Sequence, residues 1–280
     1  MKSCFFLSAS LLVACSVKAQ VIFQKTYGGH QYENSDCMYR GPGSITRTAE
    51  GGYAICHATA SYGVPASTSG ESLYFLKIDD NGDTLVTRAY NSGGNSIGRS
   101  IFEAAGGGYV MGATMGGAAG TSLIRVNANG DTLWTRSFSP IPGGFGGTGY
   151  YGFPFNDGGF GAVGEYGETV QNHSTFCAGL AKVDANGNLV FGKTYYYNPA
   201  LFNGTGMRFY SASPTSDGGV LATGYIDDME IDVVVVRMDS TGNVLWAKSY
   251  DLSTEEAGLM AKELPDHSIA VTGYVALSTT

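Results

Sequence analysis

The chain repeats one short phrase along most of its length. Residues 79–90 read Asp-Asp-Asn-Gly-Asp-Thr-Leu-Val-Thr-Arg-Ala-Tyr, and residues 127–138 read Asn-Ala-Asn-Gly-Asp-Thr-Leu-Trp-Thr-Arg-Ser-Phe. Weaker copies occupy residues 184–195 and 239–250. The turn glycines of the copies lie 48, 57 and 55 residues apart and are Gly82, Gly130, Gly187 and Gly242. This period is typical of propeller blades or solenoid coils, in which each repeat is one structural unit.

A second landmark alternates with the first. It is a turn with a Gly-Gly pair, followed by an apolar strand, at residues 50–53, 106–109, 157–160 and 217–220, with a degraded copy at 266–269. Glycine reaches positive φ without steric penalty, so these pairs predict hairpin turns. Third strands are expected at 72–78, 122–126, 177–183 and 232–238, and weaker lead strands before the Gly-Gly turns, for example at 96–104 and 208–215. Each repeat is therefore predicted to hold four strands.

The predicted fold class is all-β, a β-propeller-like repeat of four-stranded antiparallel blades with about five blades visible. The outer-strand element occurs five times, because residues 21–29 match residues 243–250, whereas the Asp-x-x-Gly turn occurs four times. The chain thus opens on the last strand of one repeat and ends inside another, which predicts an incomplete ring that the strand 21–27 helps to close. The glycine-rich residues 143–149 are interpreted as a flexible loop between strands.

These motifs resemble the propeller-type repeats of large secreted proteins from Bacteroidota. The pattern is Asp-Gly-Gly-hydrophobic, then hydrophobic-x-Asp-x-x-Gly-x-x-x-Trp-x-Lys-x-Tyr, and it covers almost all of the chain after the first residues. Residues 238–246 also resemble the repeat of quinoprotein-like propellers. The first resemblance implies a propeller scaffold of the kind that often precedes a sorting module for type IX secretion. No such module is visible, so we expect the chain to be a fragment of a longer protein.

The amino terminus has the pattern of an export signal. Lys2 is followed by an apolar run and by a small-residue cleavage site that ends at Ala19. We assign residues 1–19 to a signal peptide and 20–280 to the repeat domain, which we expect to be truncated at its C-terminal side. A second reading stays open, because residues 12–15 fit a bacterial lipobox in which Cys15 becomes a lipid anchor. Either reading predicts a protein that is secreted or held at the cell surface.

The net charge limits the classes of partner, and the cysteine content limits the possible disulfide bonds. The formal net charge is −8, which disfavours nucleic acids and anionic membranes as partners because both require a basic patch. No later segment has about 18 uninterrupted apolar residues, so no transmembrane segment is expected. Three cysteines follow the signal, and Cys37 and Cys56 are either bridged, leaving Cys177 as a buried thiol, or all three are unbridged apolar residues.

The Asp-x-x-Gly turns supply the candidate metal ligands. Oxygen-rich loops suit calcium, and the candidates are Asp79, Asn81, Asp83, Asn127, Asn129 and Asp131. The competing interpretation is that Asp and Asn side chains cap a tight turn, and it is favoured because a distal bidentate glutamate is missing. No other cofactor is expected.

Motifs for catalysis are missing from the sequence. It contains no Gly-x-Ser-x-Gly elbow, no Walker loop and no His-x-x-x-His pair. A glycosidase needs two placed carboxylates, and the available Glu165, Glu168, Glu255 and Glu256 are interpreted as solvated surface. We therefore name no catalytic residue, and the question of an enzyme stays open with the balance against it.

Aromatic residues provide the candidate ligand-binding surface. They cluster near the junction of the third and fourth repeats and are Tyr150, Tyr151, Tyr196, Tyr197 and Tyr210. Such rings suit sugars or peptides, but they also suit an ordinary propeller core and its packing between blades, which is the favoured interpretation. The predicted function is an exported, non-catalytic binding or structural module at the bacterial surface, with a glycan or a cell-surface protein as partner. The alternatives are a polysaccharide-active hydrolase or lyase and a quinoprotein-like oxidoreductase.

Overall fold

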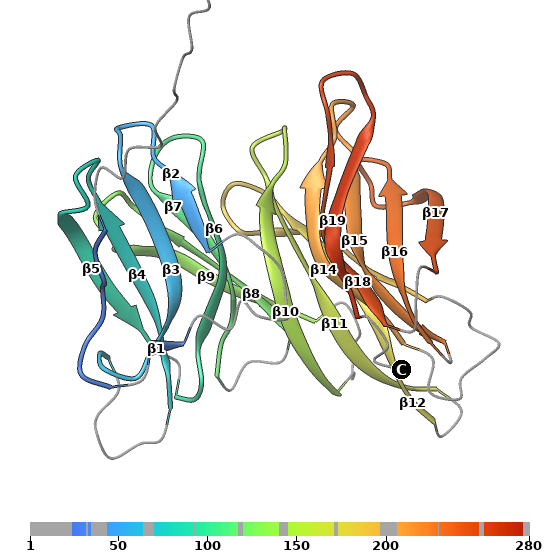
Figure 1. The fold of residues 1–280 in the computed structure, drawn as a ribbon, viewed down its shortest axis with the longest axis horizontal. Coiled ribbons are helices and arrows are strands. Elements are labelled where there is room, and N and C mark those ends of the chain that lie inside the picture. Colours follow the sequence, from blue (N-terminus) through green and yellow to red (C-terminus); the bar gives the residue numbers. More distant parts are fainter. Residues whose placement is uncertain are drawn as a thin grey trace, which may run out of the picture.

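A computed structural model describes most of the chain (Figure 1). The described residues are 24–31, 33–34, 44–63, 70–91, 93–116, 120–139, 145–170, 173–196, 206–228, 230–251 and 255–276. They form strands and turns only, so the all-β prediction is confirmed. No helix that could cross a membrane occurs in this part of the chain.

The strands form five sheets that follow one another along the chain. The first contains β1 (Glu33–Asn34), β2 (Ile45–Arg47), β3 (Tyr53–Thr59), β4 (Ser72–Ile78) and β5 (Thr84–Tyr90). The second contains β6 (Ile97–Glu103), β7 (Tyr109–Thr114), β8 (Thr121–Val126) and β9 (Thr132–Phe138). The third contains β10 (Phe145–Pro154), β11 (Phe160–Val170), β12 (His173–Val183) and β13 (Leu189–Tyr195). The fourth contains β14 (Gly206–Pro214), β15 (Val220–Asp228), β16 (Glu230–Met238) and β17 (Val244–Tyr250), and the last contains β18 (Glu256–Glu263) and β19 (Ile269–Val275).

Each of the first four sheets is an antiparallel meander of one blade, in the predicted order of lead strand, Gly-Gly strand, third strand and outer strand, and the last sheet has the first two of these strands. In the first sheet β1 and β2 both pair with β3 and together take the place of one lead strand. The lead strands β6, β10, β14 and β18 contact one another in sequence, so they lie innermost. This is the propeller-like arrangement that the repeat predicts.

The two ends of the blades differ. In an antiparallel meander, the turn from lead to Gly-Gly strand and the turn from third to outer strand lie at the same end of the sheet. Both are tight turns here, and we call this end the turn face. The longer connections, from the Gly-Gly strand to the third strand and from each outer strand to the next blade, lie at the opposite end.

The core lies between the blades and is supplied mainly by the third strands. Strand β4 is buried along its whole length, as is β8, which explains why these segments are apolar on both faces. Val234 and Val236 of β16 pack against the preceding blade, whereas Val233 and Val235 face Ala261 of the following one. Each third strand thus contributes to the contacts on both sides of its blade.

The ring is incomplete among the described residues. The last sheet contacts the fourth through β14, β15 and β16, while Figure 1 shows it well separated from the first sheet. Of the predicted strand 21–27, residues 21–23 lie outside the described residues and 24–27 are not in a strand. The strand prediction is wrong for this described part, because no strand among the described residues pairs with residues 24–27.

Two recurrent bulges were not expected from the sequence. Every four-stranded blade has a bulge near the start of its outer strand, and the lead strands β6, β10, β14 and β18 have one as well. Part of the glycine-rich segment 143–149 also differs from its prediction. Residues 145–149 belong to β10 and pair with β11, so they are strand rather than flexible loop.

Candidate functional site

The predicted calcium ligands lie in the tight turns, where backbone groups already bind them. Asp79 Oδ1 accepts hydrogen bonds from the N–H groups of Asn81 at 2.9 Å and Asp83 at 2.8 Å. Asn127 Oδ1 accepts from Asn129 and Asp131, both at 2.9 Å. One oxygen of the first turn residue thus stabilises the turn, which is the capping arrangement.

The other two copies use the same geometry. Asp184 Oδ1 accepts from the N–H groups of Asn186 and Asn188, and Asp239 Oδ1 accepts from those of Thr241 and Asn243. All four turns are therefore closed by one side-chain oxygen that binds two backbone donors.

The charge on the capping residue is stabilised but is not required. The side-chain amide of Asn188 donates to Asp184 Oδ2 at 2.9 Å, and this bond with the backbone donors lowers the pKa of Asp184. The hydrogen bonds of its own turn, led by the Asn243 N–H, lower the pKa of Asp239. Asn127 makes the same backbone contacts with a neutral amide, so the turn does not depend on a charge or a cation. Calcium binding by the six candidates stays a prediction.

Each turn is also the docking point for the preceding outer strand. Tyr90 at the end of β5 donates to the Gly130 carbonyl at 2.5 Å, and Tyr195 of β13 donates to Gly242 at 2.8 Å. In the segment before the first blade, Tyr27 donates to Gly82 at 2.7 Å and Lys25 Nζ lies 2.5 Å from Asp83 Oδ1. Residues 24–27 therefore make the contacts of an outer strand even though they lack its ladder.

The second blade makes this contact with tryptophan. Phe138 has no hydroxyl, and the ring of Trp134 instead covers Gly187, with its Nε1 donating to the Ala185 carbonyl at 3.4 Å. Gly187 has φ of 81°, and an added Cβ would lie 2.9 Å from the ring. Glycine is therefore required at this position for two reasons: the backbone has positive φ, and the Trp134 ring lies too close for a side chain.

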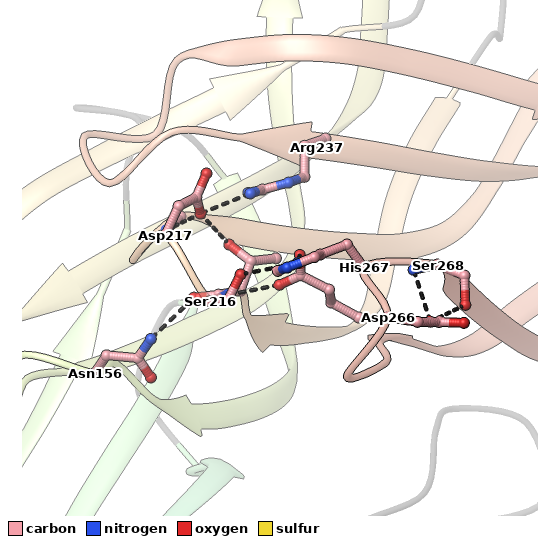
Figure 2. Close-up of polar contacts among 10 residues, drawn as sticks. Asn156, Ser216, Asp217, Arg237, Asp266, His267 and Ser268 are labelled. Carbon is pink, nitrogen blue, oxygen red and sulfur yellow. Dashed lines mark hydrogen bonds and ion pairs between the residues drawn. The ribbon is translucent and has the colours of Figure 1, made fainter.

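Serine, histidine and glutamate meet between the last two blades (Figure 2). Ser216 Oγ lies 3.4 Å from His267 Nδ1, which lies 3.0 Å from Glu263 Oε1. In a hydrolytic triad the two ring nitrogens contact different partners, one the nucleophile and the other the acid. Here both contacts involve Nδ1, so the arrangement differs from a triad.

A structural role explains this trio. The Ser216 N–H donates to Glu263 Oε2 at 2.6 Å, and the equivalent Ala49 N–H donates to Glu103 Oε2 at 2.8 Å between the first two blades. The hydrogen bond from Ser216 holds the pKa of Glu263 below its ordinary value. His267 has φ of 64° and stands where the other Gly-Gly turns have glycine. The trio is thus a contact between neighbouring turns.

The turn face also has a polar hollow of about 360 Å³ between the third and fourth blades. Its charged groups are paired, since Lys182 Nζ lies 2.6 Å from Asp157 Oδ2, and Arg237 of the neighbouring blade lies 2.6 Å from Asp217 Oδ1. Lys182 lowers the pKa of Asp157, and Arg237 lowers that of Asp217. These pairs join each third strand to the Gly-Gly turn of its own blade.

The candidate aromatic residues are dispersed over core and surface. Tyr150 and Tyr210 are buried bulge residues of the lead strands, and their rings meet edge to face at 5.2 Å. Tyr151 and Tyr196 are half-buried, and Tyr197 lies outside the described residues. The structure therefore brings together Tyr150 and Tyr210 in the core, and ligand binding by the five residues stays a prediction.

Two glutamates differ from the surface interpretation. Glu256 is fully buried, and the Glu165 side chain is 13% exposed and paired with Arg208, whose guanidinium lies 5.0 Å from the rings of both Phe176 and Tyr225. The surface prediction is wrong for both because blade packing closes over them. Glu255 is exposed.

A cluster of three carboxylate side chains, which the sequence did not indicate, lies at the end of the blades that holds the longer connections. Asp232, Asp251 and Glu256 each offer an oxygen atom, and these oxygens lie within 4.8 Å of one another. They come from β16, the residue after β17, and β18, so packing of two blades brings them together. Hard cations prefer such oxygens. Because the three residues are separated in the sequence, no sequence motif indicates this cluster.

The structure does not test whether Cys37 and Cys56 form a disulfide bond. Cys56 and Cys177 are buried thiols, with Cys56 Sγ 3.3 Å from the Ser100 carbonyl oxygen. Cys37, like Cys15, lies outside the described residues.

An exposed aliphatic side chain recurs on the outer strand of every four-stranded blade. Each one is the extra residue of the outer-strand bulge, because its neighbours on either side pair with consecutive residues of the third strand. We call these residues the bulge row: Leu85, Leu133, Val190 and Leu245, which are 54, 58, 57 and 57% exposed. No packing within the blade requires an aliphatic residue at so exposed a position.

Comparison with known proteins supports the fold. No protein-family model and no curated protein sequence matches the chain. A mutant puromycin hydrolase complexed with PGG is similar in structure, with a TM-score of 0.51 at 14% identity over 84% of this chain and 36% of that chain. This similarity shows a shared propeller-like fold, and the chain spans about a third of the hydrolase.

Two weaker similarities complete the comparison. A protein of unknown function from Bacteroides caccae gives a TM-score of 0.40 at 15% identity, over 74% of this chain and 80% of that protein. BT0996, in a complex with RGII, gives 0.45 at 10% identity, over 86% of this chain and 89% of that protein. At these TM-scores the two structures support no conclusion about this chain.

Proposed function

We propose that this chain is an exported, non-catalytic binding module that recognises a protein partner at the bacterial surface. The observation that carries the proposal is the bulge row. One aliphatic side chain stands more than half exposed at the same bulge of each of four blades. Single exposed apolar residues are ordinary, but recurrence at one structural position defines a surface.

The chemistry of the row favours protein over glycan. Leucine and valine gain free energy by removal from water, at about 25 cal/mol per Å² of apolar surface, and a protein partner with apolar pockets supplies that burial. Sugar rings are recognised chiefly by exposed aromatic faces. Tyr150 and Tyr210, the two candidates deepest in the structure, have no exposed face to offer.

The bulges give the row a geometry suited to contact. A bulge turns its extra residue out of the ladder and interrupts the outer edge of the blade. The edge thus resists uncontrolled strand pairing, while the side chain at the bulge is presented to a partner. A partner that spans several blades gains from each contact, as multivalent binding does.

The test compares a row variant with a matched surface variant. The first changes Leu85→Gln, Leu133→Gln, Val190→Thr and Leu245→Gln together, and the control changes Asn186→Ser and Thr241→Ser in two of the adjacent turns. Binding of the purified, labelled chain to immobilised cell-envelope proteins is expected for the parent and the control and to be lost in the row variant. Unfolding in urea should be unchanged to within about 0.5 kcal/mol per exposed site.

Two other results would contradict the proposal. Equal envelope binding by the parent and the row variant would remove the row from recognition. Reducing-sugar release from polysaccharide that disappears on substitution of one carboxylate, or a quinone absorbance after refolding with calcium, would show an enzyme instead. A glycan array with the same labelled protein separates a sugar ligand from a protein ligand.

A further inference from the structure

We infer that the polar hollow between the third and fourth blades binds an acidic side chain of the protein partner, through the Asn156 N–H group and Lys182. The acidic residue belongs to the partner proposed above, so its source rests on that function, whereas the site is built from this chain alone. The hollow lies on the turn face, and residues of both Gly-Gly turns and of the fourth blade's Asp-x-x-Gly turn line it.

Two other junctions between blades show the contact that this hollow lacks. The turn residue Ala49 donates its N–H to Glu103 Oε2 at 2.8 Å, and Ser216 donates its N–H to Glu263 Oε2 at 2.6 Å. Each glutamate ends the lead strand of the following blade and pairs with the first residue of the next Gly-Gly strand. The hydrogen bond from Ser216 lowers the pKa of Glu263, so a turn N–H at this position stabilises a charged carboxylate.

The junction between the third and fourth blades has the donor without the carboxylate. Asn156 stands at the position of Ala49 and Ser216, in a turn closed by the same two backbone hydrogen bonds. Pro214 stands where those junctions have glutamate, since it too pairs with the first residue of its Gly-Gly strand. The Asn156 N–H has no acceptor within the part of the chain that the structure describes, while its side-chain amide donates to the Thr215 carbonyl at 2.9 Å (Figure 2).

Lys182 supplies the positive charge beside this donor. Its side chain is 9% exposed, and its Nζ lies 2.6 Å from Asp157 Oδ2 and 4.2 Å from the centre of the Phe155 ring. An ammonium group has three N–H donors, so the pair with Asp157 leaves donors for a second carboxylate. Lys77 stands at the same position in the first blade and pairs with Glu50, and the glutamate of that junction is held in spite of this turn acid.

The remaining lining of the hollow is polar and its charges are balanced. The second acid, Asp217, lies 2.6 Å from Arg237, and Ser216 and Ser240 add hydroxyl groups. The volume of about 360 Å³ lies within the range of ligand-binding pockets. One acidic side chain therefore finds room and hydrogen-bond donors there without meeting an uncompensated negative charge.

The position of the hollow favours the same partner that contacts the bulge row. Ser240 lies in the turn that leads into β17, and Leu245 of the bulge row is the second residue of that strand. One tight turn thus joins the hollow to the row. A partner that covers Leu245 has its neighbouring residues over the hollow, and both carboxylates that fill this position elsewhere in the chain are glutamate side chains.

The junction between the second and third blades serves as an internal comparison. Ala105 stands at the donor position there, and Pro154 replaces the glutamate. The cation of this blade is Arg125, whose guanidinium donates to three backbone carbonyl groups of its own blade. Because these bonds engage the arginine, the Ala105 N–H is expected to bind a carboxylate more weakly than the Asn156 N–H does.

The experiment titrates the purified, isotope-labelled chain with a blocked glutamate, N-acetyl-glutamate N-methylamide, and follows the backbone amides by NMR. The Asn156 resonance should shift saturably, with a dissociation constant on the order of millimolar, as a few charge-assisted hydrogen bonds give. The Ala105 resonance should shift less at the same concentration. The matching blocked glutamine, which lacks the charge, should bind at least about fivefold more weakly.

Variants at two positions test the site itself. Pro214→Glu gives the chain its own carboxylate at the position of Glu103, so it should abolish the probe-induced shift of Asn156. Pro214→Ala is the matched control and should keep the affinity of the parent. Lys182→Met removes the ammonium group and should weaken probe binding by about threefold to tenfold, while Lys182→Arg, which keeps the charge, should restore most of it. Circular dichroism checks that each variant is folded.

Several outcomes would overturn the inference. Absence of a saturable shift at Asn156, or an equal shift at Ala105, would show that the hollow does not select a carboxylate. Unchanged probe binding in Pro214→Glu would place the bound carboxylate elsewhere, and tighter binding of galacturonate than of the blocked glutamate would assign the site to an acidic sugar. Failure of the proposed function is distinguishable, because a bulge-row variant that still binds envelope proteins removes the row from recognition and leaves the NMR result at Asn156 unchanged.

Discussion

At the level of single residues, two positions of each Asp-x-x-Gly turn determine its conformation. The first supplies an oxygen that accepts two backbone N–H groups, and Asp184 and Asn127 do this equally well. The fourth is a glycine because the backbone has positive φ and because the preceding outer strand lies against it. A motif that looks like a cation loop is thereby explained by local hydrogen bonding and packing.

The two requirements on glycine can be separated by mutation. Gly158→Ala introduces a side chain at φ of 85° with no atom within 4 Å, so it should lower the free energy of unfolding by about 1–2 kcal/mol from backbone strain. Gly187→Ala adds contact with Trp134 and should cost at least about 1 kcal/mol more. Urea denaturation measures both, and equal losses would show that the tryptophan moves aside without cost.

At the level of strands, each outer strand stabilises the blade that follows it. Its aromatic residues lie on the next turn, as Tyr195 does on Gly242, while its bulge presents an exposed aliphatic residue. The third strands also stabilise neighbouring blades, because both of their faces are apolar and pack in the spaces between their own blade and the blades on either side. A blade is thus stable chiefly through its neighbours.

The tyrosine contact can be tested by removing one hydroxyl. Tyr195→Phe leaves the Gly242 carbonyl without its donor in a buried position and should cost about 0.5–1.5 kcal/mol in urea denaturation. Phe138 occupies the equivalent position in the second blade, so the ring itself is accommodated. Tyr250→Phe is the matched control; the residue is 43% exposed and its hydroxyl has no hydrogen bond among described residues, so a change within about 0.5 kcal/mol is expected. Similar losses in both variants would contradict a role for the hydroxyl.

Across the whole molecule, the sheets form a row of blades with tight turns at one end and longer connections at the other. Acidic residues are spread over the turn face, where they accept hydrogen bonds or pair with cations. The carboxylate group of Asp232, Asp251 and Glu256 lies at the opposite end. The described part of the molecule therefore has two chemically different faces.

Acid sensitivity follows from the turn face. The folded-state pKa values of Asp157, Asp184, Asp217 and Asp239 lie below the ordinary value of about 3.9. The unfolded chain therefore binds protons more readily, so the stabilisation is complete above about pH 4 and is lost as the pH falls through the folded-state values. Thermal melts should give a constant Tm contribution from these groups above that pH and a falling Tm below it.

A charge-removing variant provides the control for acid sensitivity. Asp184→Asn combined with Asp239→Asn should fold, because Asn127 caps its turn with an amide. This variant should lose part of the decline in Tm below about pH 4. An unchanged decline would show that other carboxylates cause it.

Prediction from the sequence succeeded where the determining interactions are local. The third strand at 72–78 has those bounds in the structure, and the degraded turn at 266–269 is a turn with His267 at positive φ. Prediction failed where packing decides, since the carboxyl side chain of Glu256 is buried and residues 24–27 form no strand without a partner. The recurrent bulges were also missed, because a bulge changes pairing without changing the alternation of residue types enough to be read.

The strands, the tight turns and the propeller-like repeat follow from the amino-acid sequence alone, because hydrophobic alternation, Asp or Asn capping and glycine at positive φ act within a few residues of one another. Tertiary packing determines which side chains meet between blades, as the tyrosines on the turns and the group of Asp232, Asp251 and Glu256 do, and which outer-strand residues form the exposed bulge row. These features depend on the packing and register of segments far apart in the chain, and no local pattern records them.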